Sequence, residues 1–262
     1  MAKVNISVVR DYPRDIPITG VFHLLERGQG GIRQSNPLAH LSDEDLETVL
    51  NRARRCRIRP KHLLFRQGDR HRGIFLIQSG VVRTFYTSPT GREITLAYWQ
   101  PGNFVGGPDV FEDCIHMWSG ITVRDTEVFH LRGRDLRELM AQIPDLALGM
   151  VEALVYKGRC FSSLVQLLGT RSVSGRLSQV LLALCDNYGI PAADGHGVVI
   201  AVNLTHEDLA HMVGASRQWV TTTLDRLQKK DIVHIRKRQL VILRPDLLRA
   251  QETHEAHKLS AA

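Results

Sequence analysis

Short apolar segments separated by glycine-containing turns recur between residues 63 and 131. In residues 94–98, apolar side chains at Ile94, Leu96 and Tyr98 alternate with Thr95 and Ala97. Strands spaced about ten residues apart with turn signals between them are typical of an antiparallel sandwich or barrel. The predicted strands are Leu63–Phe65, Gly73–Ile77, Val81–Tyr86, Ile94–Tyr98 and a run from Gly120 to Leu131. We therefore predict an antiparallel β domain over residues 41–143.

A helix opens this domain, and an irregular leader precedes it. Ser42 is a good N-cap, and acidic residues fill the turn that follows. Prolines and glycines interrupt any periodicity in residues 1–40. We expect the leader to be irregular or partly ordered.

A long helix is predicted over residues 144–171, with Pro144 at its favoured first position. Apolar residues in it follow the alternating four-and-three spacing of a coiled-coil seam. We interpret this seam as a dimerisation surface; the alternative is a helix packed on its own domain. The seam residues are Leu146, Met150, Ala153, Cys160, Leu164 and Leu167, with Lys157 also at a seam position.

Residues 204–232 contain two short helices joined by a tight turn. Thr205 is the N-cap of the first helix, Gly214 ends it, and Ser216 caps the second. The buried stripe of the second helix is Val220, Leu224 and Leu227. This arrangement is a helix-turn-helix, although an ordinary helical hairpin in a core would show the same periodicity.

The exposed start of the second helix carries residue types that read DNA. Arginine pairs with guanine, glutamine pairs with adenine, and threonine contacts a thymine methyl group or a phosphate. We predict that four residues here touch DNA, with Arg217 or Gln218 giving base specificity. The four are Arg217, Gln218, Thr221 and Thr222, beside the caps Thr205 and Ser216.

A β-hairpin follows the two helices. Apolar segments 232–235 and 240–243 flank a basic turn formed by Arg236, Lys237 and Arg238. A hairpin after a recognition helix makes a winged helix, and its basic tip would lie against phosphate. Residues 172–250 thus form a DNA-binding domain, and residues 251–262 form a polar tail.

Composition agrees with an anionic partner and gives no sign of an enzyme. The formal net charge is +7 and the pI is about 9.5. Cys56, Cys114, Cys160 and Cys185 are scattered, so they indicate neither a disulfide framework nor a zinc site. The sequence shows no P-loop, nucleophile elbow or HExxH motif. Without a membrane-spanning run or a signal peptide, the chain is expected to be cytoplasmic.

Four segments together resemble the Crp/Fnr family of bacterial transcription regulators. They are FRQGDRHRGIFLIQSGVV (65–82), GREITLAYWQPGNFVGG (91–107), VSGRLSQVLLAL (173–184) and LTHEDLAHMVGASRQWV (204–220). The resemblance implies an α+β protein with an N-terminal β-roll like a cyclic-nucleotide-binding domain, a long dimerisation helix and a C-terminal winged helix-turn-helix. It also implies a homodimer that binds a palindromic operator, contacts RNA polymerase and responds to an effector held between the β-roll and the long helix.

The sequence argues against two effector branches of this family. Family members that bind cyclic AMP carry a glutamate where Gly107 stands here, and an Arg-Ser pair further on. No arginine occurs between Arg92 and Arg124, although a buried phosphodiester needs a guanidinium or several donors. The leader contains no cysteine, which argues against an iron–sulfur cluster.

Two effector hypotheses remain open. Cys114 and His116 resemble the C-x-H haem-ligand segment of the family's carbon monoxide sensors, although Met117 and Trp118 are additional residues before Ser119. The other hypothesis, which we favour, is a small organic effector in a mostly apolar pocket. The combined candidates for an effector pocket are Tyr98, Gly106, Gly107, Cys114, His116, Met117, Trp118, Ser119, Phe161, Ser162 and Val165.

We therefore predict a dimeric, sequence-specific DNA-binding transcription regulator that is not an enzyme. A hypothesis from a different class is a haem or redox carrier module without specific DNA binding.

Overall fold

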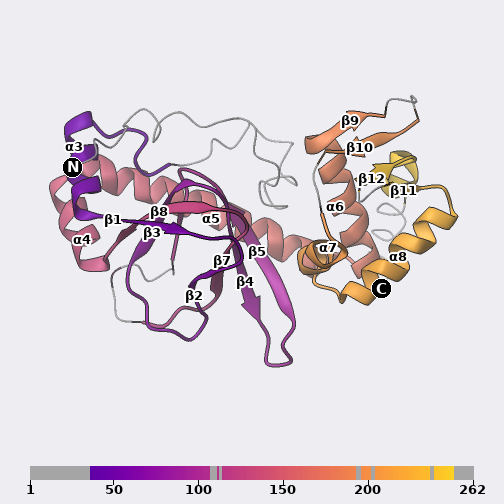
Figure 1. Ribbon diagram of the computed structural model, residues 1–262, viewed down its shortest axis with the longest axis horizontal. Helices are drawn as coiled ribbons and strands as arrows, with labels where there is room; N and C mark the ends of the chain where they lie inside the picture. Colours follow the sequence, from indigo (N-terminus) through magenta and orange to yellow (C-terminus); the bar gives the residue numbers. More distant parts are fainter. Residues whose placement is uncertain are drawn as a thin grey trace. The chain divides into compact units, whose positions relative to one another are not determined.

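The computed structural model describes residues 36–106, 111, 114–192, 196–201, 204–236 and 239–250. Its chain divides into two compact units. The described part of the first unit comprises residues 36–87 and 96–160, and that of the second comprises residues 88–95 and 161–250. Figure 1 labels the helices and strands of both units.

The first unit begins with the predicted helix and continues into strands. Helix α3 (Asp43–Arg52) starts at Ser42, whose hydroxyl accepts a hydrogen bond from the Asp45 N–H. The predicted strands are present, and the run from Gly120 to Leu131 is divided into two. The strands are β1 (Arg54–Ile58), β2 (Leu63–Phe65), β3 (Ile74–Ser79), β4 (Val82–Thr87), β5 (Glu93–Trp99), β6 (Phe104–Val105), β7 (Ser119–Thr122) and β8 (Thr126–Leu131).

These strands form two antiparallel four-stranded sheets. One has the order β1-β8-β3-β6 and the other the order β2-β7-β4-β5. In the first sheet, Cys56 lies opposite Val128, and Leu76 lies opposite Phe129. Strands β1 and β6 were not predicted from the sequence, because β1 reads as a basic run and β6 has only two residues.

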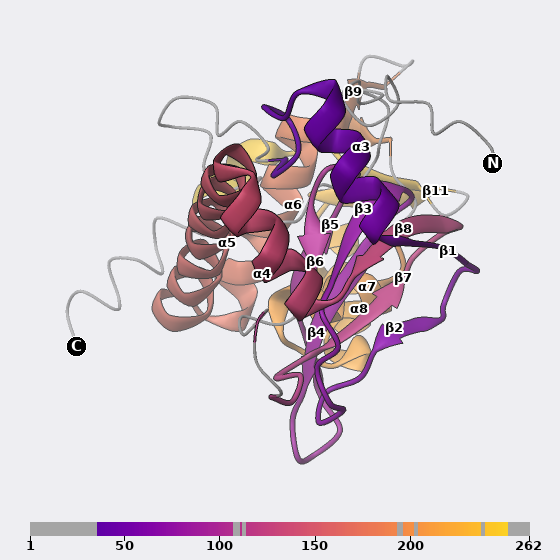
Figure 2. The same ribbon diagram turned by 90° about the vertical axis from the view of Figure 1, so that its left-hand side faces the viewer.

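Helices cover one side of the first sheet. Helix α4 (Gly133–Gln142) follows β8 directly, and the first turns of α5 (Pro144–Thr170) follow α4. Both ribbon views show α3 and α4 next to the start of α5 (Figures 1 and 2). Buried side chains from all three helices form one core with strands β3, β6 and β8, for example Leu46, Phe129, Leu136 and Met150. Burial of this apolar surface is the main term that holds the unit together.

Helix α5 runs through the division between the units, since residues up to Cys160 belong to the first unit and those from Phe161 to the second. The predicted domain boundaries at residues 143 and 171 stay predictions. The second unit continues with α6 (Val173–Tyr188), which Ser172 caps through the Gly175 N–H.

The rest of the second unit is a winged helix-turn-helix. It contains α7 (His206–Val213), α8 (Arg217–Lys229) and one antiparallel sheet with the order β11-β12-β10-β9. Its strands are β9 (Gly189–Pro191), β10 (Val198–Ile200), β11 (Val233–Arg236) and β12 (Gln239–Ile242). The predicted α+β fold class is therefore confirmed. Among the described helices, none has the length and apolar character that a membrane span would need.

Candidate functional site: the DNA-reading helix and the interior of the β-roll

Two well-capped helices build the candidate DNA-reading unit. The Thr205 hydroxyl accepts a hydrogen bond from the Asp208 N–H, and the Asp208 carboxylate accepts one from the Thr205 N–H. This capping box satisfies two backbone donors that the start of α7 would otherwise leave unpaired. Gly214 ends α7 with a φ of 63°, in the left-handed region where a side chain would be strained. The Ser216 hydroxyl then accepts from the Trp219 N–H and starts α8.

The start of α8 presents polar side chains to solvent. Arg217, Gln218 and Thr222 are exposed, while Val220 and Leu224 on the opposite face are fully buried. Three of the four side chains predicted to touch DNA are therefore available to a ligand.

The fourth side chain, Thr221, is partly buried and already bonded. Its hydroxyl lies 2.8 Å from His206 Nδ1 and donates a 3.0 Å hydrogen bond to the Arg217 carbonyl oxygen. These contacts join the starts of α7 and α8. Thr221 therefore positions the reading helix in this structure, and its predicted contact with DNA stays a prediction.

The wing is attached to the reading helix by a side chain. Gln228 Oε1 accepts a 3.2 Å hydrogen bond from the Ile235 N–H of β11. In the hairpin, Arg236 lies opposite Gln239. Lys237 and Arg238, which we predicted at the basic tip, fall outside the described residues, and so does the side chain of Arg236.

Inside the first unit, a lysine of α5 lies among aromatic rings of the β-roll. Lys157 Nζ is 3.4 Å from the centroid of the Trp99 ring and 4.5 Å from that of Phe104. It donates a 2.7 Å hydrogen bond to the Phe104 carbonyl oxygen. Burial lowers the pKa of Lys157 to about 7, and the electrostatic interaction with Cys160 acts in the opposite direction. A cation held in this way attracts anionic groups.

The segment that contains the haem-ligand candidates is extended and pairs with the loop before β3. The His71 N–H donates to the Cys114 carbonyl oxygen, and the His116 N–H donates to that of Asp69. Cys114 is partly buried, whereas His116 is only 3% exposed. The structure thus brings both predicted residues to one short segment beside His71.

The His116 ring is enclosed by other rings. Its centroid is 4.4 Å from that of Phe65 and 4.5 Å from that of His71. Burial lowers the pKa of His116 to about 4, with a further decrease from His71 and an opposing effect from Asp69. The ring is therefore neutral at neutral pH. Its Nδ1 atom is buried and has no hydrogen-bond partner in the described part of the chain.

The other predicted pocket residues are dispersed. Tyr98 is buried in β5, Ser119 is buried in β7, and Gly106 is buried directly after β6. Trp118 is partly buried, and Met117 is 58% exposed. The exposure of Met117 in a single chain does not favour the prediction that it lines an effector pocket, which stays a prediction.

Four more of these candidates are not placed in the interior of the β-roll by the described residues of the first unit. Gly107 falls outside the described residues. Phe161, Ser162 and Val165 belong to the second unit. Val165 is 69% exposed in a single chain. Their place in an effector pocket stays a prediction.

The predicted dimer seam needs a correction. Its residues are between 1% and 7% exposed within one chain, so they are not available to a second copy. Leu146, Met150 and Ala153 pack in the core of the first unit. The seam interpretation is wrong because periodicity identifies an apolar face without identifying its partner. The buried seam residues are Leu146, Met150, Ala153, Cys160, Leu164 and Leu167.

A neighbouring stripe of α5 is exposed instead. Its side chains follow the same three-and-four spacing, which keeps them on one face of the helix. An added Cβ at Gly158, on this face, would meet no atom within 4 Å. The exposed apolar members of the stripe are Leu148, Val151, Val155 and Val165.

Two features were missed by reasoning from the sequence. Lys157 was noticed only as a weak point of the seam, although a lysine on an apolar face signals a partly buried cation. Arginine-rich runs in residues 52–59, 66–73 and 132–137 were also not used. These runs are far apart in the sequence, and the sheet brings them together.

Comparison with known proteins gives two domain matches. A family model for the cyclic nucleotide-binding domain matches residues 55–143, and one for the Crp-like helix-turn-helix domain matches residues 175–251.

No group of three or more histidine, cysteine, aspartate or glutamate side chains in the described residues has the geometry of a metal site.

Curated relatives match most of the chain. The anaerobic regulatory protein of Bacillus subtilis is 29% identical, over 80% of this chain and 89% of its own. The cyclic AMP receptor protein of Thermus thermophilus is 28% identical, over 77% and 90% respectively. Among solved structures, the c-di-GMP responsive regulator CLP of Xanthomonas campestris matches with a TM-score of 0.67 and 22% identity, covering 77% of this chain and 99% of that chain. The last match supports the fold.

Proposed function

Because the chain belongs to the Crp/Fnr family of transcription regulators, we propose that it is a homodimer that reads a palindromic operator and responds to a small organic effector. DNA binding and an effector-binding domain belong to the family as a whole. The observation that carries the proposal is α8, a capped helix whose exposed start holds Arg217 and Gln218. Two such helices related by a twofold axis would enter successive major grooves. RNA polymerase is the proposed partner at the promoter.

The proposed dimer contact is the exposed stripe of α5. Two copies that pack Leu148, Val151 and Val155 against each other would bury these side chains. Glycine at position 158 would let the two helices approach closely. This contact replaces the seam predicted from the sequence.

The proposed effector carries an acidic group. Lys157 supplies a cation inside the first unit. Trp99, which contacts Lys157, and its neighbour Tyr98 in strand β5 supply apolar surface. An effector anion beside Lys157 would raise its pKa and stabilise the charged form. A cyclic nucleotide fits less well, because no arginine is present between Arg92 and Arg124 to hold its phosphate.

Haem-based sensing is the second candidate, favoured by the buried Nδ1 of His116 without a partner among the described residues. A buried polar atom normally has a partner, so an atom without one is a candidate ligand. An absorption spectrum of the reduced protein, purified after expression with haem available, separates the two candidates. A Soret band that shifts with carbon monoxide and disappears in His116→Ala would establish haem.

The experiment that tests DNA reading is selection from a random DNA library, followed by footprinting. We expect an enriched palindrome with half-sites about one helical turn apart. If no sequence is enriched at physiological salt, with or without candidate organic acids, the proposed function is wrong and a carrier module without specific DNA binding is favoured.

A further inference from the structure

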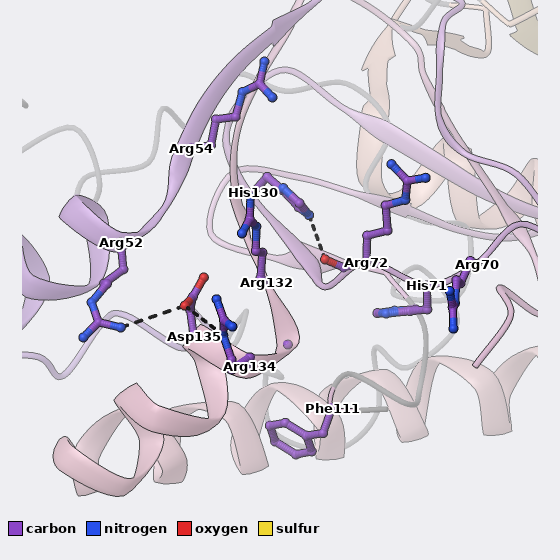
Figure 3. A pocket seen from close by; sticks show the side chains of 11 residues that line it. Arg52, Arg54, Arg70, His71, Arg72, Phe111, His130, Arg132, Arg134 and Asp135 are labelled. Carbon is purple, nitrogen blue, oxygen red and sulfur yellow. Dashed lines mark hydrogen bonds and ion pairs between the residues drawn. The ribbon is translucent and has the colours of Figure 1, made fainter. Parts of the chain in front are cut away.

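A strongly basic pocket lies on the first unit, and it has a volume of about 860 Å³. Six arginines line it, compared with one acidic residue. Figure 3 shows these side chains around a common space. The lining residues are Arg52, Arg54, Arg70, His71, Arg72, Phe111, His130, Arg132, Gly133, Arg134 and Asp135.

Helices and strands fix the backbone positions of three of these arginines. Arg52 ends α3, Arg54 begins β1, and Arg132 precedes α4. Strand β1 pairs with β8, and this pairing sets Arg54 opposite His130. The cluster is therefore assembled by the sheet from segments about 80 residues apart in sequence (54 versus 130).

Three of the six pocket arginines have no acidic partner in the described part of the chain, while Arg134 lies 4.0 Å from Asp135. Arg52 forms ion pairs with Glu138 at 3.0 Å and with Asp135 at 3.9 Å. In the described part of the chain, no carboxylate lies within 4.0 Å of the guanidinium groups of Arg54, Arg72 or Arg132. Like charges held together cost free energy unless an anion compensates them.

One of the two histidines in the wall, His130, responds to this charge. His130 Nε2 lies 3.1 Å from the Arg72 carbonyl oxygen, a contact drawn in Figure 3. Burial is the largest cause that lowers the pKa of His130, and Arg132, Arg54 and Arg72 lower it further. Its own ring therefore adds little charge, and the pocket's positive potential comes from the arginines.

The start of α4 adds backbone donors to the same wall. Its N-cap residue, Arg132, makes no side-chain capping hydrogen bond, and Gly133, Arg134 and Asp135 line the pocket. The first N–H groups of a helix need acceptors, and phosphate oxygens are well suited to them. The arginines and the start of α4 thus both offer hydrogen-bond donors to the same pocket.

We propose that this pocket binds a small molecule that carries two or more phosphate groups. Guanidinium groups bind phosphate through paired hydrogen bonds, and several around one pocket favour a ligand with several phosphates over a single phosphate. The volume is in the range of small-molecule sites. This binding site is separate from the site proposed for the acidic effector beside Lys157, and its occupation does not depend on DNA binding.

The test is isothermal titration of the full-length protein with inorganic tripolyphosphate at physiological salt. A pocket variant replaces Arg54, Arg72 and Arg132 with glutamine. The matched control replaces Arg57, Arg59 and Arg66 with glutamine, which removes the same charge from exposed positions outside the pocket. We expect the pocket variant to weaken binding about tenfold or more, with the control within about twofold of the native protein.

Three results would overturn the proposal. They are an absence of binding by the native protein, equal weakening in both variants, and stronger binding of polyglutamate than of tripolyphosphate, which would indicate an acidic protein segment as the partner. Hydrogen exchange of the native protein keeps the test valid if the pocket variant does not fold. Tripolyphosphate should then protect the amides at the start of α4, and their unchanged exchange would equally contradict the proposal.

Discussion

Lys157 Nζ lies 3.4 Å from the centroid of the Trp99 ring, inside the effector domain. The lysine comes from the long helix and the tryptophan from the end of β5, so the contact joins the helix to the roll. Because burial lowers the pKa of Lys157 to about 7 from its ordinary value of 10.5, its charge is set by this environment. A ligand that contacts Lys157, or a pH change near 7, would therefore act directly on a residue of the proposed dimerisation helix.

The first prediction concerns the pH dependence of stability. Between pH 7 and 10.5 the unfolded chain binds a proton at Lys157 that the folded chain has released. The contribution of Lys157 to stability therefore rises with pH in this window, and its cost is fully present below pH 7. Lys157→Met should reduce the rise by up to about 1 kcal/mol per pH unit between pH 7 and 9.

Urea unfolding at pH 7, 8 and 9 measures this effect. Arg159→Met is the matched control, since Arg159 is exposed on the same helix and should leave the rise unchanged. The same pH dependence in Lys157→Met and the native protein would show that Lys157 is not a buried titrating group.

A second prediction has the same pH direction in a lower pH window. The folded pKa of His116 is about 4, below its ordinary value of 6.5, so the unfolded chain binds more protons between these values. Stability should therefore fall as the pH decreases from 6.5 to 4. His116→Phe keeps a ring against Phe65 and should reduce the loss between pH 7 and 5 by up to about 2 kcal/mol.

Thermal unfolding at pH 7 and pH 5 is the measurement. His62→Phe, at an exposed histidine, provides the comparison. If His116→Phe loses as much stability as the native protein on acidification, the buried neutral state of His116 is wrong.

Local signals explain why much of the fold could be predicted. Ser42, Thr205 and Ser216 each cap the helix that was expected to start there, and Gly214 ends α7 as expected. Such signals depend on neighbouring residues only. Helix α4 was missed because Arg132 provides no side-chain cap to mark its start.

The candidate sites were harder to predict, because their residues come from positions far apart in the sequence. The environment of Lys157 is formed by Trp99 and Phe104, more than fifty positions earlier in the chain, and no local pattern reveals it. The dimer seam failed for a related reason. Leu146 and Leu148 lie on different faces of α5, and only the folded chain shows that Leu146 is covered by its own core.

Base reading should depend on Gln218. Replacing it with alanine removes a paired donor and acceptor that would bind an adenine. We expect preference at one base position of each half-site to decrease by about 1–3 kcal/mol, with no change in dimerisation. Competition gel shifts on the selected operator and its single-base variants would measure this. Unchanged preference would exclude Gln218 as the reader.

The wing should contribute affinity without sequence preference. Replacing Arg236, Lys237 and Arg238 with alanine should weaken binding to all sequences together and make the dependence on salt less steep, by about 0.9 in slope for each lost phosphate contact. The control is the exposed triple variant of Arg57, Arg59 and Arg66, which carries the same charge change in the first unit. An equal effect of the two variants would indicate general electrostatic attraction and no wing contact.

Dimerisation should depend on the exposed stripe of α5. Val151 and Val155 are 56% and 54% exposed in a single chain, and replacing both with glutamate would place like charges opposite each other in the proposed dimer. We expect this double variant to sediment as a folded monomer and to lose operator binding, because one helix-turn-helix contacts only a half-site. Leu63→Glu, at an apolar residue 41% exposed on β2, should remain dimeric. A dimeric Val151→Glu, Val155→Glu variant would place the interface elsewhere, whereas a monomer that still binds the full operator tightly would separate DNA reading from dimerisation.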